Sequence, residues 1–176
     1  SYTYRYNPPA DMAADDSMYN YYEQGENKTG LLHLDADGKE LKRIEFSQTD
    51  EDGNSFYVSN FFVDNSGNVY LSDWQNVYIY DQDGNQKTTV DLSENGGELC
   101  ELKAGVVGVC YYKNDEAKPE ESGRVFQEID PAAGKLTGDT VKLPDSAYNF
   151  FPGDDVYDIY YDYNGNIYGY KFDTDT

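Results

Sequence analysis

The chain has 176 residues and carries 34 Asp and Glu residues against 13 Lys and Arg residues, so its formal net charge is −21. Such an acidic surface repels phosphate backbones and anionic headgroups, which argues against nucleic-acid partners and against docking on anionic membranes. No apolar stretch approaches the ~18 residues of a membrane-spanning helix, so we expect no direct membrane span. The length suits one substantial domain or part of a larger protein.

Short alternating runs of β-branched and aromatic residues dominate the sequence, which contains 19 tyrosines. Between these runs lie clusters of Asp, Asn and Gly, which tolerate positive φ angles or bond to their own backbone and therefore suit turns. No long run places apolar residues at helical spacing. The sequence predicts an all-β fold.

The predicted strands fall into four repeats of a single domain. These repeats cover approximately residues 1–46, 55–92, 98–143 and 155–176. In the first repeat we expect a loop at 7–16. The strands of that repeat are predicted at 2–6, 18–23, 31–34 and 40–46. The fourth repeat contains only two predicted strands, so we expect it to be incomplete.

The second repeat has the clearest pattern. Val69 to Ser72 and Val77 to Tyr80 alternate as its central strands, separated by a loop from Asp73 to Asn76. Turns from Asp64 to Gly67 and from Asp81 to Gly84 bound this pair of strands.

These motifs return with a nearly constant period. Turns that begin at Asp35, Asp81 and Asp130 are 46 and 49 residues apart, and the related motifs at Asp64 and Asp162 are 98 residues apart. Four strands in ~40–50 residues are typical of a β-propeller blade. The alternative is a β-sandwich with evenly spaced hairpins. We favour a β-propeller, or a propeller segment, of about four four-stranded antiparallel repeats.

The motif Asp-x-x-Gly-Asn-Val/Ile-Tyr begins at Asp64 and again at Asp162. It resembles the blade motif of NHL-like bacterial β-propeller repeats. The whole chain also resembles the propeller region of secreted Firmicutes lipoproteins, which are sometimes fused to extracellular solute-binding domains. This resemblance implies an extracellular or cell-surface bacterial protein whose leader is absent from this chain. It also implies more blades than the sequence contains, hence a longer protein or self-association through open sheet edges.

Trp74 is the main candidate for ligand recognition. It lies in the predicted loop with Asp73, Gln75 and Asn76, which in propellers is on the face that usually carries ligands. An exposed Trp beside amide and carboxylate groups has the composition of a sugar-stacking site. In the alternative, Trp74 packs between neighbouring repeats, as the high burial usual for a lone Trp favours.

Asp81 and Asp83 resemble the start of a calcium loop, as do Asp35 and Asp37. Neither pair is followed by the carboxylate that an EF-hand requires at its twelfth position. We therefore expect hairpin turns and no cofactor, with calcium as the one candidate ion. His33 is the only histidine and no Gly-x-Ser-x-Gly motif accompanies it, so we expect a strand residue rather than a catalytic base.

Cys100 and Cys110 are the only cysteines. They flank a predicted hairpin turn centred near Gly105, which places them directly opposite each other on neighbouring strands. This arrangement suits either a disulfide in an exported protein or two small buried apolar residues.

The sequence contains no catalytic motif, which favours a non-catalytic binding or interaction module that recognises carbohydrate, another solute or a protein partner. One alternative is a glycan-cleaving hydrolase or lyase. That enzyme needs Asp and Glu carboxylates from several repeats to lie within roughly 5–10 Å of each other. A second alternative is a structural protein-contact module.

Overall fold

The computed structural model describes residues 11–23, 28–50, 52–94, 96–143, 156–161 and 167–171. These residues form strands joined by turns and loops, with one short 3-10 turn at Pro119–Glu121, so the fold is all-β. In this part of the chain, no helix is long and apolar enough to cross a membrane. The predicted strand 2–6 and the turn that begins at Asp162 lie outside the described residues.

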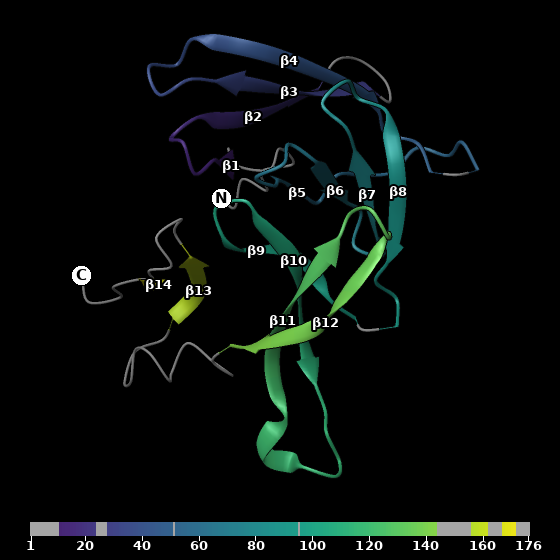
Figure 1. Cartoon of the computed structure of the whole chain (residues 1–176), viewed down its shortest axis with the longest axis vertical. Coiled ribbons are helices and arrows are strands. Elements are labelled where there is room, and N and C mark those ends of the chain that lie inside the picture. The colour runs from purple at the N-terminus through teal and green to yellow at the C-terminus, as the bar shows by residue number, and fades with distance from the viewer. Residues whose placement is uncertain are drawn as a thin grey trace.

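Three antiparallel sheets of four strands follow one another along the chain, and within each sheet the strands keep their sequence order (Figure 1). Sheet I contains β1 (Asp11–Met12), β2 (Met18–Glu23), β3 (Lys28–Leu34) and β4 (Glu40–Ser47). Sheet II contains β5 (Asn60–Val63), β6 (Val69–Ser72), β7 (Asn76–Tyr80) and β8 (Gln86–Asp91). Sheet III contains β9 (Glu98–Lys103), β10 (Val106–Lys113), β11 (Gly123–Asp130) and β12 (Lys135–Lys142). A separate hairpin pairs β13 (Val156–Tyr161) with β14 (Ile167–Lys171).

Sheet I differs from the sequence prediction at its first strand. β1 lies within the segment 7–16 that was expected to be a loop, and it pairs Asp11 with Tyr19 and Met12 with Met18. Two residues are too few to show an alternating pattern, so the pairing depends on contacts that only the folded chain supplies.

The Asp-x-x-Gly turns share one geometry. At Asp81, the Oδ1 atom accepts hydrogen bonds from the backbone N–H groups of Asp83 and Asn85, both at 2.9 Å, and Gly84 has a φ of +81°. Glycine adopts this left-handed φ without steric cost, while the carboxylate satisfies two backbone donors. Asp81 and Asp83 thus belong to a hairpin turn. The same pattern occurs in the turns that begin at Asp35, Asp50 and Asp64.

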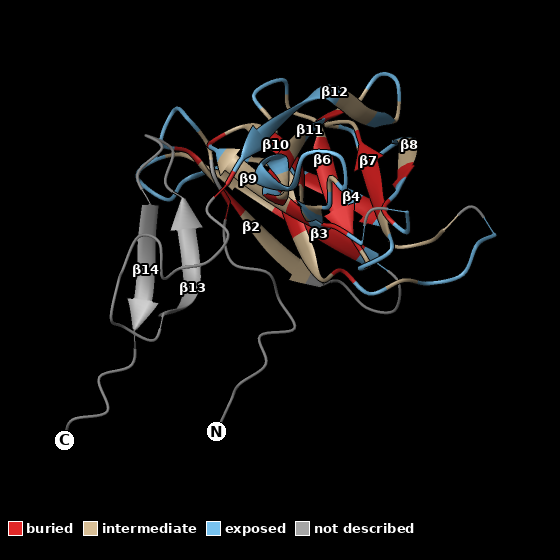
Figure 2. Cartoon of the chain, turned by 90° about the horizontal axis from the view of Figure 1, so that it is seen from below, coloured by how far each residue is buried: buried red, intermediate tan, exposed pale blue. Residues whose placement is uncertain are grey.

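Sheet II is buried on both faces, which explains the nearly continuous apolar sequence of its central strands. Val69 and Leu71 of β6 face a core shared with sheet I, whereas Tyr70 faces a second core shared with sheet III. Because successive side chains of a strand point to opposite faces, both sets must be apolar. Figure 2 shows β6 and β7 as buried strands in the interior of the molecule.

The first strands of the three sheets lie beside one another near the middle of the molecule, and the last strands lie on the outside (Figure 1). Two hydrogen bonds join β5 to the inner strands of the other two sheets. The backbone N–H of Val63 donates to Asp11 Oδ2 (2.7 Å), and Asn60 Nδ2 donates to the carbonyl oxygen of Leu99 (3.1 Å). β13 contacts the inner strand of sheet III.

A disulfide joins Cys100 to Cys110, whose Cα atoms lie 6.2 Å apart. The prediction that these residues lie directly opposite each other is wrong, because Cys100 pairs with Gly108 and Cys110 with Glu98. A bulge between Val106 and Val107 shifts the register, so the bond runs diagonally across two strands. Disulfides persist mainly in oxidising compartments, and this bond indicates such an environment.

Candidate functional site

Trp74 is exposed in the loop between β6 and β7, with 68% of its surface accessible. This exposure contradicts the high burial expected in the alternative, in which the tryptophan packs between neighbouring repeats. Its φ of +82° lies in the left-handed region, where a residue other than Gly is strained by roughly 1–3 kcal/mol. The surrounding loop must hold the tryptophan in this conformation.

Asp73 supplies that restraint. Its Oδ1 atom accepts hydrogen bonds from the backbone N–H groups of Gln75 (3.0 Å) and Asn76 (2.7 Å), and its Oδ2 atom accepts one from the Tyr78 hydroxyl (2.9 Å). Burial and the hydrogen bond to Asp73 raise the pKa of Tyr78, so its hydroxyl keeps the proton that it donates. The Tyr78 ring in turn stacks on Phe56, with ring centroids 4.0 Å apart. Asp73 thus holds the loop in shape.

Gln75 and Asn76 also help to hold the loop in shape, through hydrogen bonds of their backbone carbonyl groups. The Gln75 carbonyl accepts a hydrogen bond from Leu92 N–H (2.8 Å), and the Asn76 carbonyl accepts one from Asp73 N–H (3.2 Å). Of the four predicted ligand-binding residues, Trp74 alone lines the cavity described next.

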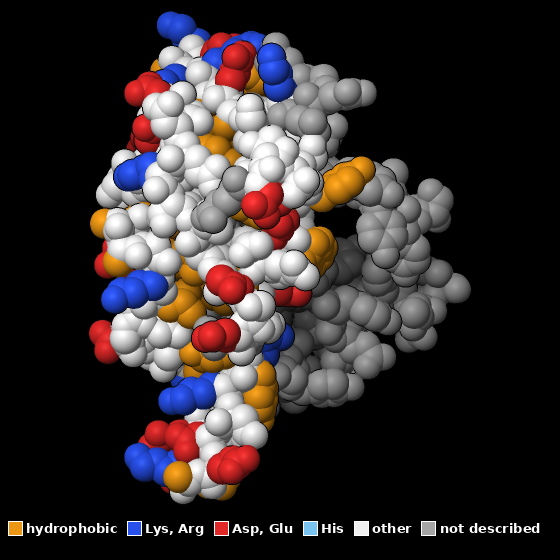
Figure 3. All heavy atoms as spheres, turned by 90° about the vertical axis from the view of Figure 1, so that its right-hand side faces the viewer, with side chains coloured by type: hydrophobic (Ala, Val, Ile, Leu, Met, Phe, Trp, Pro, Cys, Tyr) orange, Lys and Arg blue, Asp and Glu red, His pale blue; other side chains and the backbone are white. Residues whose placement is uncertain are grey.

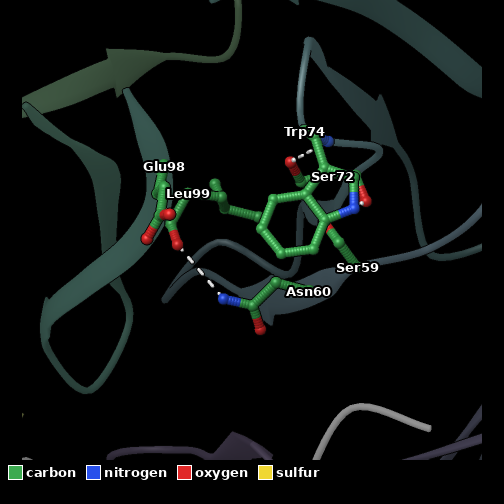
Figure 4. Close-up of a pocket in the computed structure, with 6 residues that line it drawn as sticks. All are labelled: Ser59, Asn60, Ser72, Trp74, Glu98 and Leu99. Atoms are coloured by element: carbon green, nitrogen blue, oxygen red, sulfur yellow. Dashed lines mark hydrogen bonds between the residues drawn. The ribbon is translucent and has the colours of Figure 1, made fainter. Parts of the chain in front are cut away.

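A cavity of about 140 Å³ opens beside Trp74, between sheets II and III. In Figure 4 the indole ring lies between Ser59 on one side and the first residues of β9 on the other. The cavity is lined by Ser59, Asn60, Ser72, Trp74, Glu98 and Leu99. The start of β5, the β6–β7 loop and the start of β9 together form what we call the Trp74 end of the sheets.

The polar groups of this cavity differ in the hydrogen bonds that they already form within the protein. Asn60 donates to the Leu99 carbonyl, and its Oδ1 atom accepts the Phe61 N–H at 2.9 Å. The Ser59 hydroxyl donates to the Ser72 carbonyl at 2.9 Å. Glu98 is exposed and is the one charged residue of the lining. The arrangement offers an aromatic face bordered by a carboxylate, an amide and a hydroxyl.

The sequence pattern pointed to Trp74 but not to the other lining residues. Asn60 and Glu98 are far apart in the chain, and they meet because two inner strands start at the same end of the molecule. The available signal was that both residues begin the first strand of the sheet in successive repeats.

A larger hollow of about 380 Å³ lies at the opposite end of the sheets, between the β1–β2 loop and the β5–β6 turn. Its walls are mostly turns whose polar groups already have partners. Asp64 accepts from Ser66 N–H, Asn68 N–H and the Tyr70 hydroxyl, and Gln82 Nε2 donates to the Gly67 carbonyl. This hollow presents few free polar groups to a ligand.

His33 lies near that hollow but does not form a catalytic triad. Its Nε2 atom is 2.8 Å from Ser17 Oγ, and Ser17 Oγ also bonds to Asp15 Oδ1. Because the carboxylate only accepts hydrogen bonds, Ser17 donates to Asp15 and His33 donates to Ser17. The histidine therefore cannot take the serine proton, and it stacks on Tyr19 with ring centroids 4.2 Å apart.

Two carboxyl groups from different sheets meet at the inner strands, a feature that the sequence did not reveal. Asp11 is only 6% exposed, and a hydrogen bond joins its side chain to Glu101 of β9. Burial raises the pKa of Asp11 to about 6. Burial and the neighbouring Asp11 raise the pKa of Glu101 to about 9. At neutral pH Glu101 therefore keeps a proton that the pair shares.

Among the residues that the structure describes, no group of three or more His, Cys, Asp or Glu side chains is arranged to hold a metal ion. No protein-family model matches the chain, and no curated protein matches it. A solved structure of a protein of unknown function from Bacteroides caccae is similar, with a TM-score of 0.54 at 15% sequence identity. The match covers 93% of this chain and 55% of that protein, so this chain spans about half the length of its structural neighbour. The likeness concerns the fold alone.

Proposed function

We propose that the protein is a non-catalytic recognition module of an exported bacterial protein, and that it binds carbohydrate at the cavity beside Trp74. The observation that carries this proposal is an exposed tryptophan held in a strained backbone conformation by a dedicated hydrogen-bond network. Strained residues cluster at functional sites, where the surrounding structure maintains them.

The chemistry of the cavity suits a sugar. The apolar C–H face of a pyranose ring can stack on the indole, while ring hydroxyls bond to Glu98, Asn60 and Ser59 at its edge. The volume of about 140 Å³ matches part of a ligand rather than a whole drug-sized molecule. One sugar residue of a glycan fits this description.

We also propose that the three sheets are blades of an NHL-like β-propeller, as in the propeller region of secreted Firmicutes lipoproteins. Each sheet is a meander in sequence order, and the first strands of neighbouring sheets contact each other. The contact of β13 with β9 supports a further blade beginning at β13. In a two-layer sandwich, each sheet is covered by another sheet on one face only. Sheet II is covered on both faces, which favours the propeller arrangement.

In the glycan-cleaving alternative, Asp11 and Glu101 would be the catalytic carboxyl pair, because they come from two different repeats. A direct hydrogen bond places these carboxyl groups closer together than the ~5 Å that a retaining glycosidase requires for its nucleophile and acid. Asp11 is also buried and bonded to the Val63 backbone. These features fit a structural pair better than a catalytic one.

A protein-contact role is the second candidate, favoured by the outer strands. Leu41 of β4 and Val141 of β12 are large apolar residues that are 55% and 46% exposed. Both strands are the last of their sheets, and each therefore offers an edge to a partner chain.

Isothermal titration against a panel of neutral oligosaccharides tests the proposed function. We expect binding by the wild-type protein and its loss in Trp74→Ala. Tyr112→Ala is a matched control, because Tyr112 of β10 is also exposed (63%) but is not among the residues that line the cavity. Equal loss in both variants, or binding that survives Trp74→Ala, would refute the proposed site.

A further inference from the structure

A second exposed aromatic ring lies at the same end of the sheets as Trp74. Tyr57 belongs to the segment between β4 and β5 and is 76% exposed. Its neighbours point inward, because Phe56 packs against the first core and Val58 is 5% exposed. The segment is thus anchored on both sides of Tyr57, and the tyrosine ring is presented to solvent from a fixed position.

Two connections tie this segment to the loop that carries Trp74. On one side of Tyr57, Ser59 donates its backbone N–H (2.7 Å) and its hydroxyl (2.9 Å) to the Ser72 carbonyl. On the other side, Phe56 stacks on Tyr78, whose hydroxyl bonds to Asp73. The first connection reaches Ser72, two residues before Trp74. The second connection reaches Asp73, the residue directly before Trp74.

These connections limit the separation of the two rings. Tyr57 is two residues before Ser59, and Trp74 is two residues after Ser72, while an extended pair of residues spans at most ~7 Å. Since Ser59 and Ser72 are in hydrogen-bond contact, the two aromatic side chains are separated by a distance that a short oligosaccharide can bridge.

The charge at this end restricts the ligand further. Glu98 is the charged residue of the cavity lining, and Asp73 and Asp50 both lie close enough to Tyr78 to raise its pKa. The chain as a whole carries a net charge of −21. On the face shown in Figure 3, acidic and basic side chains are interspersed. Sugars with carboxylate or sulfate groups would be repelled here.

We propose that Tyr57 is a second aromatic platform, and that the ligand is an uncharged oligosaccharide lying across Tyr57 and Trp74. This inference rests on the proposed function, because it assigns the class of glycan that the Trp74 site takes. Trp74 and the cavity hold one sugar residue, and Tyr57 stacks on another residue of the same chain.

The test uses the whole protein and four neutral hexasaccharides, namely cellohexaose, xylohexaose, mannohexaose and maltohexaose, together with their monosaccharides and hexagalacturonate. Affinities are measured by isothermal titration for the wild type, Tyr57→Ala, Trp74→Ala and the control Tyr112→Ala. Circular dichroism verifies that each variant folds, as expected for substitutions of exposed side chains.

We expect one or more neutral hexasaccharides to bind, with the dissociation constant raised about tenfold by Tyr57→Ala, the size of one aromatic contact. Trp74→Ala abolishes binding, Tyr112→Ala leaves it unchanged, and the monosaccharide binds Tyr57→Ala as it binds the wild type.

Three results would overturn the inference. Hexasaccharide affinity that is unchanged in Tyr57→Ala but lost in Trp74→Ala removes the second platform and leaves the proposed function standing. Tighter binding of hexagalacturonate than of every neutral chain refutes the uncharged class alone. Absence of binding by every sugar in the panel refutes both the inference and the proposed function.

Discussion

Replacing Glu101 with Gln is expected to remove a pH dependence of stability between pH 6 and 8. The carboxyl group of Glu101 has a pKa of about 9 in the folded protein, against 4.5 for an unperturbed Glu. Over this interval the folded chain binds a proton that the unfolded chain releases. The stabilisation that comes from protonated Glu101 is therefore fully present below pH 4.5. It decreases as the pH rises and is lost above pH 9.

The size of the effect follows from this linkage. One proton released on unfolding lowers the free energy of unfolding by about 1.4 kcal/mol per pH unit, so two pH units give an upper limit of about 2.7 kcal/mol. Because Glu101 is only partly buried, solvent screening reduces this value, and we expect about 1–2 kcal/mol. Asp11, with a pKa of about 6, contributes in the same direction mainly below that pH.

The assay is urea denaturation at pH 6, 7 and 8, supported by melting temperatures, which fall roughly 2–4 °C per kcal/mol for a chain of this size. Gln keeps the shape of the protonated acid and can still donate to Asp11, so the variant should fold and lose only the slope. Glu98→Gln, an exposed residue of the same strand, is the control and should keep it. Equal slopes in wild type and Glu101→Gln would refute the shared proton.

Two further predictions concern turns and the Trp74 loop. Gly84 and Gly38 share a φ near +82°, but a Cβ at Gly84 would collide with the backbone carbonyl of Glu45, whereas one at Gly38 meets nothing. Gly84→Ala should cost about 2 kcal/mol or more and Gly38→Ala about 1 kcal/mol, measured by chemical denaturation, and equal costs would contradict the packing of sheet I on sheet II. Tyr78→Phe removes the donor to Asp73 and should cost about 1 kcal/mol. It should also lower the fluorescence anisotropy of the single tryptophan, and unchanged anisotropy would show that the loop does not need this bond.

Local sequence patterns were sufficient to predict sheet II. Val69 to Ser72 coincides with β6, and Val77 to Tyr80 lies within β7, because β-branched and aromatic residues alternate between turns that carry their own Asp and Gly signals. The short strand β1 could not be predicted, since its two residues pair only when β2 is in place.

The candidate site was predictable only in part. Trp74 stood out by its residue type and loop position, yet its exposure depends on a backbone conformation that Asp73 and Tyr78 impose. The pairing of Asp11 with Glu101 depends on how three sheets are placed around their inner strands, and no short motif encodes that placement. The diagonal geometry of the disulfide could not be predicted from the sequence either, because a one-residue bulge decides the register of the two strands.

Because Trp74 has a positive φ, its backbone conformation and its proposed contact with a ligand favour different residues at this position. Folding alone favours glycine there, since glycine adopts this conformation without strain, whereas the sugar recognition that we propose requires the indole ring. Selection for thermal stability would therefore enrich glycine at position 74 and remove the proposed binding in the same step. A library screened for stability and for glycan binding separately would give opposite preferences at this position, which makes it a natural place to measure the trade-off between the two properties.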